Sequence, residues 1–195
     1  MERKKNIILI GFMGCGKTSV GIKLSYRLRM PVEDTDKYIE QKEGRSISSI
    51  FVEDGESFFR ALETKTLEEF RDKSYTRIIS VGGGTPVNPV NRELLRQCGT
   101  VVYLRVRPET VYERLKNDTS RPLLQCEKPL DRIHSLMTER REAYEETADI
   151  IIDVDDKSME EVLEELTAQL PGKGKLKDRK AEEGKKRRRK ENRGR

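Results

Sequence analysis

The residues of this 195-residue chain best suited to chemistry form one segment, Gly11-Phe12-Met13-Gly14-Cys15-Gly16-Lys17-Thr18. The segment matches the phosphate-loop pattern G-x-x-x-x-G-K-[ST] at every fixed position. Glycines let the backbone wrap a phosphate, N–H groups at a helix start attract anions, and Lys17 can neutralise the β- and γ-phosphates. Thr18 can offer its hydroxyl to Mg²⁺. The alternative is a glycine-rich turn that only joins a strand to a helix. The residues expected to bind the nucleotide here are Gly14, Cys15, Gly16, Lys17, Thr18 and Ser19.

Two carboxylates, Asp34 and Asp36, follow a short extended segment near Val32 and Glu33. If the backbone is extended there, their side chains share a face and can reach one site. Such a pair beside a phosphate loop suits Mg²⁺ positioning by one carboxylate and orientation of a hydroxyl by the other. Asp36 could instead cap a helix that begins at Lys37, and capping does not exclude the functional role.

Three arginines and a glycine run are candidates for binding anions. Arg60 follows two phenylalanines in a helical pattern, where an arginine either reaches solvent or binds an anion. Residues 82–84 are all glycine and follow an apolar segment, so they either bring backbone amides close to a ligand or form a flexible turn. Arg121 and Arg140 either bind anions or are ordinary surface charges.

Short apolar segments and amphipathic patterns alternate along the chain. Strands are predicted at 6–10, near 32–33, and at 77–81, 100–106 and 149–154. Helices are predicted from about 20 to 28 and at 57–71, 108–116, 129–147 and 158–170. This alternation predicts an α/β fold of three layers, with a five-stranded parallel sheet between helices. Ligands then bind at the carboxyl ends of the strands.

Two segments differ from this pattern. Residues 117–128 are polar and contain Arg121, so they are a candidate for a mobile lid. Residues 171–195 carry 13 Lys or Arg and 4 Asp or Glu, which leaves 27 basic and 31 acidic residues in 1–170. We therefore expect a slightly acidic folded domain over 1–170 and a basic, disordered tail over 171–195. The basic isoelectric point reflects the tail and does not indicate a nucleic-acid-binding fold.

Cysteine usage and hydropathy point to a cytoplasmic protein. Cys15, Cys98 and Cys126 show no C-x-x-C spacing, so neither a disulfide framework nor a thiolate zinc site is expected. The neighbours of Cys15 favour a small side chain over a reactive thiol. No apolar run approaches the roughly 20 residues of a membrane span.

Taken together, the motifs resemble the shikimate kinase family. G-F-M-G-C-G-K-T, D-T-D, G-E-x-x-F-R, S-V-G-G-G, R-P-L-L and R-x-x-x-Y-E-E-x-A-D occur here in that family's order, over residues 6 to about 168. The resemblance implies a fold like that of nucleoside monophosphate kinases, with a mobile lid. It also implies transfer of the γ-phosphoryl group of ATP to the 3-hydroxyl of shikimate, in the chorismate pathway to aromatic amino acids.

The resemblance also implies a role for each candidate residue. Lys17, Asp34, Asp36 and Arg121 form the catalytic set, with Arg121 reaching from the lid to the ATP phosphates and Arg114 beside the adenine. Thr18 ligates a single Mg²⁺ directly, and Asp34 does so through water. A monomer is the family expectation. The residues implied to hold shikimate are Asp36, Arg60, Gly82, Gly83 and Arg140, with the two arginines on its carboxylate.

Two other functions are open on the sequence alone. A gluconate kinase of the same fold would also bind a hydroxylated carboxylate, although the G-E-x-x-F-R and triple-glycine motifs favour shikimate. A nucleic-acid-associated protein could use the six consecutive positive charges at 185–190, which would bind phosphate backbones weakly and without sequence preference. The single histidine, His134, is expected to be structural or exposed.

Overall fold

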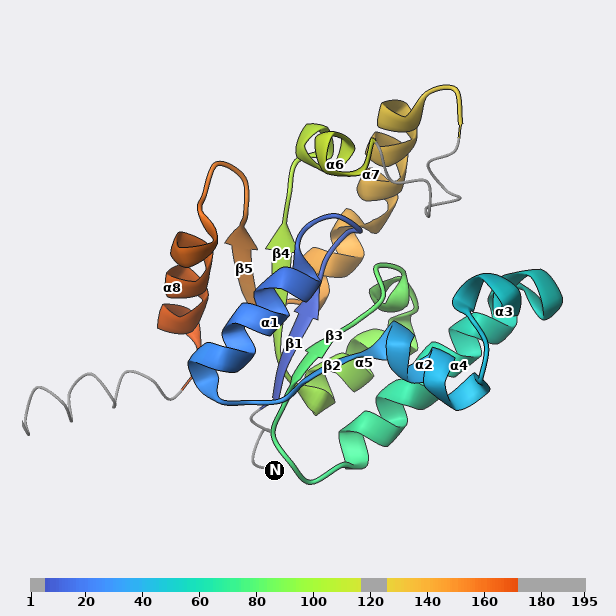
Figure 1. Ribbon diagram of the computed structural model, residues 1–195, viewed down its shortest axis with the longest axis horizontal. Coiled ribbons are helices and arrows are strands. Elements are labelled where there is room, and N and C mark those ends of the chain that lie inside the picture. Colours follow the sequence, from blue (N-terminus) through green and yellow to red (C-terminus); the bar gives the residue numbers. More distant parts are fainter. Residues whose placement is uncertain (1–5, 117–125, 172–195) are drawn as a thin grey trace, which may run out of the picture.

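The computed structural model describes residues 6–116 and 126–171, and its centre is a parallel sheet (Figure 1). Five strands pair in the order β2-β3-β1-β4-β5, and their number agrees with the sequence prediction, which gave no order. Each pair is parallel, so the carboxyl ends of all five strands meet at one edge of the sheet. The strands are β1 (Asn6–Ile10), β2 (Val32–Asp34), β3 (Ile78–Ser80), β4 (Gly99–Arg105) and β5 (Ile150–Asp153).

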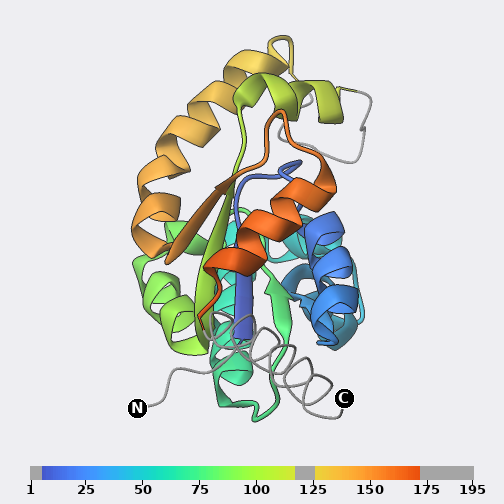
Figure 2. The same cartoon turned by 90° about the vertical axis from the view of Figure 1, so that its left-hand side faces the viewer.

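Helices cover both faces of the sheet, which confirms the three-layer α/β/α architecture. Figure 2 shows α5 and α7 on one side of the sheet and α1 on the other, and α8 packs beside α1 against β5. The helices are α1 (Lys17–Leu28), α2 (Thr35–Glu43), α3 (Ile47–Glu53), α4 (Gly55–Asp72), α5 (Pro89–Cys98), α6 (Pro108–Leu115), α7 (Pro129–Thr147) and α8 (Met159–Gln169), with a 3₁₀ turn, η1 (Thr85–Val87).

The central strand explains why the site lies where it does. Every residue of β1 is buried, because β3 and β4 flank it and helices cover both faces. An apolar strand of this kind is fixed in the core, so the glycine-rich loop that follows it leaves the sheet at a defined point. The phosphate loop is thereby placed at the carboxyl edge, between the ends of β3 and β4.

Three helices were missed by the hydrophobic pattern: α2, α3 and α5. The first two pack with the start of α4 around a small core of their own, made of Ile39, Ile50 and Phe59. Helices α2 and α3 bury only one or two residues each, so their apolar stripe is hard to detect. Helix α5 buries four residues, so its stripe was present in the sequence but was not recognised. The caps were the better signal, because Ser46 caps α3 and Asn88 precedes a proline at the start of α5.

Several sequence predictions concern residues outside the described ranges. These include most of the proposed lid, at 117–125 and with it Arg121, and the tail from 172 onward. Within 6–116 and 126–171, none of the helices is both long and apolar enough to cross a membrane.

Candidate active site

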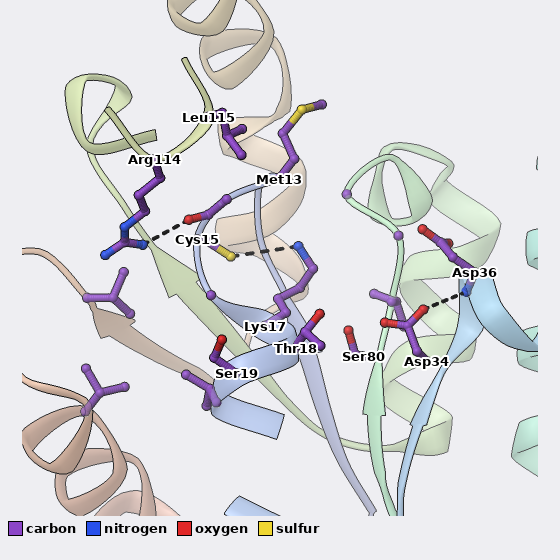
Figure 3. Close-up of a pocket in the computed structure, with 18 of the residues that line it drawn as sticks. Met13, Cys15, Lys17, Thr18, Ser19, Asp34, Asp36, Ser80, Arg114 and Leu115 are labelled. Carbon is purple, nitrogen blue, oxygen red and sulfur yellow. Dashed lines mark hydrogen bonds between the residues drawn. The ribbon is translucent and has the colours of Figure 1, made fainter. Parts of the chain in front are cut away.

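A pocket of about 600 Å³ lies at the carboxyl edge of the sheet (Figure 3). The phosphate loop and the start of α1 form its floor, and the ends of β2 and β3 form one wall. The start of α8 and residues from α6 form the opposite wall. The described residues from the sequence prediction that line it are Gly14, Cys15, Gly16, Lys17, Thr18, Ser19, Asp34, Asp36, Gly82, Gly83 and Arg114.

Gly16 and Gly11 of the phosphate loop are required for different reasons. Gly16, the residue before α1, has φ 101°, a left-handed conformation that other residues rarely adopt. Gly11 has φ 140°, and a Cβ there would lie only 2.7 Å from the carbonyl oxygen of Leu104. The loop can therefore fold closely over the end of β4 only with glycine at its start.

Lys17 stands at the centre of the pocket (Figure 3). Its Nζ donates hydrogen bonds to the carbonyl oxygens of Gly11 at 2.7 Å and Phe12 at 3.1 Å, and contacts Cys15 Sγ at 3.8 Å. These contacts hold the positive charge inside the loop at the first turn of α1, where the helix dipole also attracts anions. Cys15 is 1% exposed and belongs to the main core, as expected of a small packed side chain.

Asp34 and Asp36 both line the pocket, but not in the way that the sequence suggested. The chain becomes helical at Thr35, so the two residues do not share an extended strand. Asp34, and not Asp36, caps α2: its Oδ1 accepts hydrogen bonds from the backbone N–H of Asp36 at 3.0 Å and Lys37 at 3.3 Å. The other oxygen of Asp34 points into the pocket (Figure 3). The N-terminus of α2 therefore places both residues at the pocket.

Arg60 lies against the glycine turn that follows β3. A Cβ on Gly84 would be 2.5 Å from Arg60 Nη1, so glycine is needed for this approach. The guanidinium pairs with Glu63 at 2.7 Å and Glu56 at 2.8 Å. Burial alone would lower the pKa of Arg60, but the two carboxylates raise it, so the guanidinium stays charged. Arg60 is therefore a fixed positive charge beside the turn.

Glu63, whose side chain is only 1% exposed, is a further residue at this turn that was not predicted from the sequence. Its carboxylate also accepts a hydrogen bond from the Thr85 hydroxyl at 2.5 Å. A Cβ on Gly82 would lie 2.9 Å from an oxygen of Glu63 and 2.9 Å from one of Asp36. The glycine turn therefore lies between two carboxylates. The available signal was the i, i+3 spacing of Glu63 from Arg60 on one helix.

Arg140 reaches the same region from α7. Its guanidinium lies over the Phe12 ring, 5.7 Å from the centroid, and the ring is buried within the phosphate loop. A Cβ on Gly83 would be 3.4 Å from the Gly11 carbonyl oxygen, so the glycine turn and the loop are in contact. Arg60 and Arg140 are not among the lining residues of the pocket itself. Arg60 lies beside the glycine turn and Arg140 beside the phosphate loop, both at the margin of the pocket.

Arg114 on α6 lies on the opposite side of the loop from Asp34 (Figure 3). It donates a hydrogen bond to the Gly14 carbonyl oxygen at 2.9 Å. Near it, the pocket wall from the end of β5 and the start of α8 is largely apolar, with Val154, Met159 and Val162. A flat apolar group can lie between this wall and the guanidinium, as a nucleotide base would.

The oxygen ligands in the pocket fit a magnesium ion. The Thr18 hydroxyl and the Asp34 carboxylate line the same cavity, together with the buried Ser80, which pairs with Asp34 in the sheet. In the described ranges there is no group of three or more His, Cys, Asp or Glu that could hold a metal. A site with one carboxylate and one hydroxyl suits Mg²⁺, which takes its remaining ligands from phosphates and water.

Comparison with known proteins agrees with this geometry. A family model described as shikimate kinase matches residues 13–171. The chain is 45% identical over 166 residues to a shikimate kinase of Dehalococcoides mccartyi, covering 85% of this chain and 93% of that protein. A solved shikimate kinase from Acinetobacter baumannii in complex with shikimate is 36% identical with a TM-score of 0.78, covering 85% and 92% of the two chains.

A more distant structure, a gluconokinase from Sinorhizobium meliloti, is 15% identical with a TM-score of 0.50 and shares the fold alone. The family model covers the phosphate loop from Met13, both carboxylates, the glycine turn and the described arginines. The chain therefore belongs to the shikimate kinase family.

Proposed function

We propose that this protein transfers the γ-phosphoryl group of ATP to the 3-hydroxyl of shikimate, giving shikimate 3-phosphate and ADP. The observation that carries the proposal is that the phosphate loop contacts the glycine turn, with Arg60 beside the turn and Arg140 beside the loop. A nucleotide site and an anion-binding acceptor site therefore meet at one edge of the sheet. In the cell this reaction belongs to the chorismate pathway to aromatic amino acids.

The acceptor site is assigned to Arg60, Arg140, Asp36 and the backbone of Gly82 and Gly83. The carboxylate is the only permanent charge on shikimate, and a planar guanidinium can bind it with two parallel hydrogen bonds. Arg60 is already paired with two glutamates, which fix its orientation before substrate arrives. Asp36 is then placed to orient the attacking hydroxyl and to take its proton.

The nucleotide site is assigned to the phosphate loop, residues 14–19, with Arg114 beside the adenine. Lys17 binds the β- and γ-phosphates, and its contacts with loop carbonyls hold it at the α1 N-terminus until they enter. Arg121, which lies outside the described residues, is assigned to the phosphates as well, on a lid at about 117–128. Closure of a lid would exclude water and so limit wasteful hydrolysis of ATP.

One Mg²⁺ per subunit is assigned to Thr18 directly and to Asp34 through water. When bound, the ion neutralises charge on the β- and γ-phosphates. Phosphoryl transfer through a loose transition state depends mainly on position and charge. Lys17 and Arg121 therefore stabilise the transferring group, Asp34 supports the metal, and Asp36 aligns the hydroxyl.

A coupled assay of ATP turnover tests the proposed reaction, with shikimate, gluconate and nucleoside monophosphates as acceptors. We expect turnover with shikimate at least 100-fold above that with any other acceptor. Faster turnover with gluconate or with a nucleoside monophosphate would overturn the assignment. Product analysis by ³¹P NMR identifies the hydroxyl that is phosphorylated.

We also propose that the protein is a cytoplasmic monomer. Cys15, Cys98 and Cys126 are all free thiols, which suits a reducing compartment. Sedimentation equilibrium tests the monomer. Any nucleic-acid binding through the basic tail is proposed to be weak, nonspecific and steeply dependent on salt, and a salt titration of DNA binding measures it.

A further inference from the structure

A buried tyrosine joins two groups that the proposed function assigns to shikimate. The Tyr144 hydroxyl donates a hydrogen bond to the Gly83 carbonyl oxygen at 2.5 Å, and the residue is 1% exposed. Arg140 lies one turn earlier on the same face of α7, so the two side chains are neighbours. Burial raises the pKa of Tyr144 well above its usual value, and the nearby Arg140 lowers it by less. The hydroxyl therefore stays protonated and remains a donor.

The hydrogen bond fixes the glycine turn from behind. A Cβ on Gly83 would lie 3.4 Å from the Gly11 carbonyl oxygen, 3.5 Å from the Met13 nitrogen and 3.7 Å from the Tyr144 hydroxyl. Gly83 is thus held between the phosphate loop and α7. Because the peptide is planar and trans, a fixed Gly83 carbonyl also fixes the direction of the next N–H group.

Arg140 is constrained by the same tyrosine. Its guanidinium has the Phe12 ring on one side, 5.7 Å from the centroid, and interacts with the Tyr144 hydroxyl. An arginine side chain has many rotamers, and holding it in one of them costs conformational entropy. If the buried hydroxyl already restricts Arg140 before substrate arrives, less conformational entropy is lost when shikimate binds.

We propose that Tyr144 is a positioning residue of the acceptor site. Its hydroxyl holds the Gly83 carbonyl and the Arg140 guanidinium in the arrangement that binds shikimate, without itself contacting the substrate. The proposal rests on the proposed function, because it takes both groups as shikimate contacts. Tyr144 would then contribute to binding of the acceptor and not to binding of the nucleotide.

The neighbouring Tyr103 supplies a matched control. Its ring packs on that of Tyr144, with centroids 5.1 Å apart, and is likewise buried. A phenylalanine at either position keeps the ring pair and removes one buried hydroxyl. Of these two tyrosine hydroxyls, only that of Tyr144 hydrogen-bonds to the glycine turn among the contacts of the described residues. The two variants therefore separate positioning of the turn from packing of the core.

The experiment compares Tyr144→Phe and Tyr103→Phe with the unaltered full-length protein. We expect Tyr144→Phe to raise the shikimate KM three- to tenfold, as for loss of one neutral hydrogen bond, and to leave the ATP KM within twofold. Tyr103→Phe should change neither KM. An unchanged shikimate KM in Tyr144→Phe, or equal rises in both variants, would overturn the proposal.

A double-mutant cycle with Arg140→Lys provides the second measurement. If Tyr144 acts through Arg140, the two substitutions together raise the shikimate KM by less than the product of the single effects. Fully multiplicative effects contradict the proposal. Failure of the proposed function is distinguishable from both results, because the unaltered protein would then show no turnover with shikimate.

Discussion

Lys17 places its ammonium group where the phosphates must enter, held by the carbonyls of Gly11 and Phe12. We expect Lys17→Met to lower kcat by at least about 100-fold, the loss typical when one group that stabilises transition-state charge is removed. Shikimate affinity measured by calorimetry should change less than twofold, because the acceptor contacts lie on other elements. Lys23→Met, at an exposed lysine of the same helix, is the control and should keep full activity. Retained turnover in Lys17→Met would contradict the phosphate-loop assignment.

Arg140 and Arg141 are adjacent on α7 and allow a second comparison. Arg140 lies over the Phe12 ring at the site, whereas Arg141 pairs with Glu145 one turn away and is exposed. Arg140→Lys keeps the charge but loses bidentate binding and ring stacking, so we expect the shikimate KM to rise about tenfold. Arg141→Lys should leave it unchanged. Steady-state kinetics at saturating ATP measure both, and equal KM values would remove Arg140 from the site.

Sequence could predict these residues where neighbours in the chain are neighbours in space. The phosphate loop is contiguous, so Lys17 and Thr18 were predictable from the motif alone. Tyr144 was not predicted to take part, because it acts on Gly83, 61 positions away. Glu63 pairs with the nearby Arg60, but its contact with Thr85 spans 22 positions. Contacts of this kind depend on how the helices pack, which no local pattern states.

At the scale of elements, the strands were predictable and the small helices were not. Buried parallel strands are continuous apolar runs, so β1 was predicted at its observed bounds. The start of α2 was missed because a strand of three residues passes directly into a helix at Thr35. That error put Asp34 and Asp36 on one extended segment, whereas Asp34 caps α2 and Asp36 lies in its first turn.

The capping role of Asp34 can be separated from its proposed metal role. Asparagine caps a helix about as well as aspartate but carries no charge, whereas alanine neither caps the helix nor carries a charge. We expect Asp34→Asn to keep the unfolding free energy and Asp34→Ala to lower it by about 1 kcal/mol. Both should raise the Mg²⁺ concentration for half-maximal activity several-fold. Denaturant unfolding and a Mg²⁺ titration measure the two properties, and an unchanged Mg²⁺ requirement in Asp34→Asn would refute the metal role.

The pairing of β2 with β3 adds a pH dependence to stability. Burial raises the pKa of Glu33, but hydrogen bonds from Tyr75 and the fully buried Arg77 lower it by more. The pKa of Glu33 therefore lies below its ordinary value of 4.5. The stabilisation is therefore complete above pH 4.5 and is lost as pH falls through the lowered pKa. We expect Glu33→Gln to lower the unfolding free energy by about 2 kcal/mol at pH 7, since hydrogen bonds to charged groups are lost.

The difference between Glu33→Gln and the unaltered protein should shrink as the pH falls below 4.5. Asp153→Asn, which breaks an exposed pair with Arg105, is the control and should cost less than about 1 kcal/mol. Denaturant unfolding from pH 3 to 7 measures both variants. A difference that stays constant over this range would show that the carboxylate of Glu33 does not carry the effect.

At the scale of the whole molecule, charge divides the chain into two parts. Residues 1–170 carry 27 basic and 31 acidic residues, and the positive charges that serve the proposed chemistry stand inside that acidic part. Arg60 and Lys17 are effective because burial and nearby partners fix them, not because the region is basic. The 13 basic residues of the segment 171–195 set the isoelectric point. None of them belongs to a motif that carries a proposed site residue.

Removing the tail tests this division directly. Leu170 is 8% exposed and is part of the main core, so a chain ending there keeps every core residue of the described ranges. We expect its kcat and both KM values to stay within twofold of those of the full chain, with loss of salt-dependent DNA binding. A chain ending at Glu165 also lacks the buried Leu166 and Leu170 and should melt at a clearly lower temperature. A large fall in kcat on removal of 171–195 alone would show that the tail takes part in catalysis.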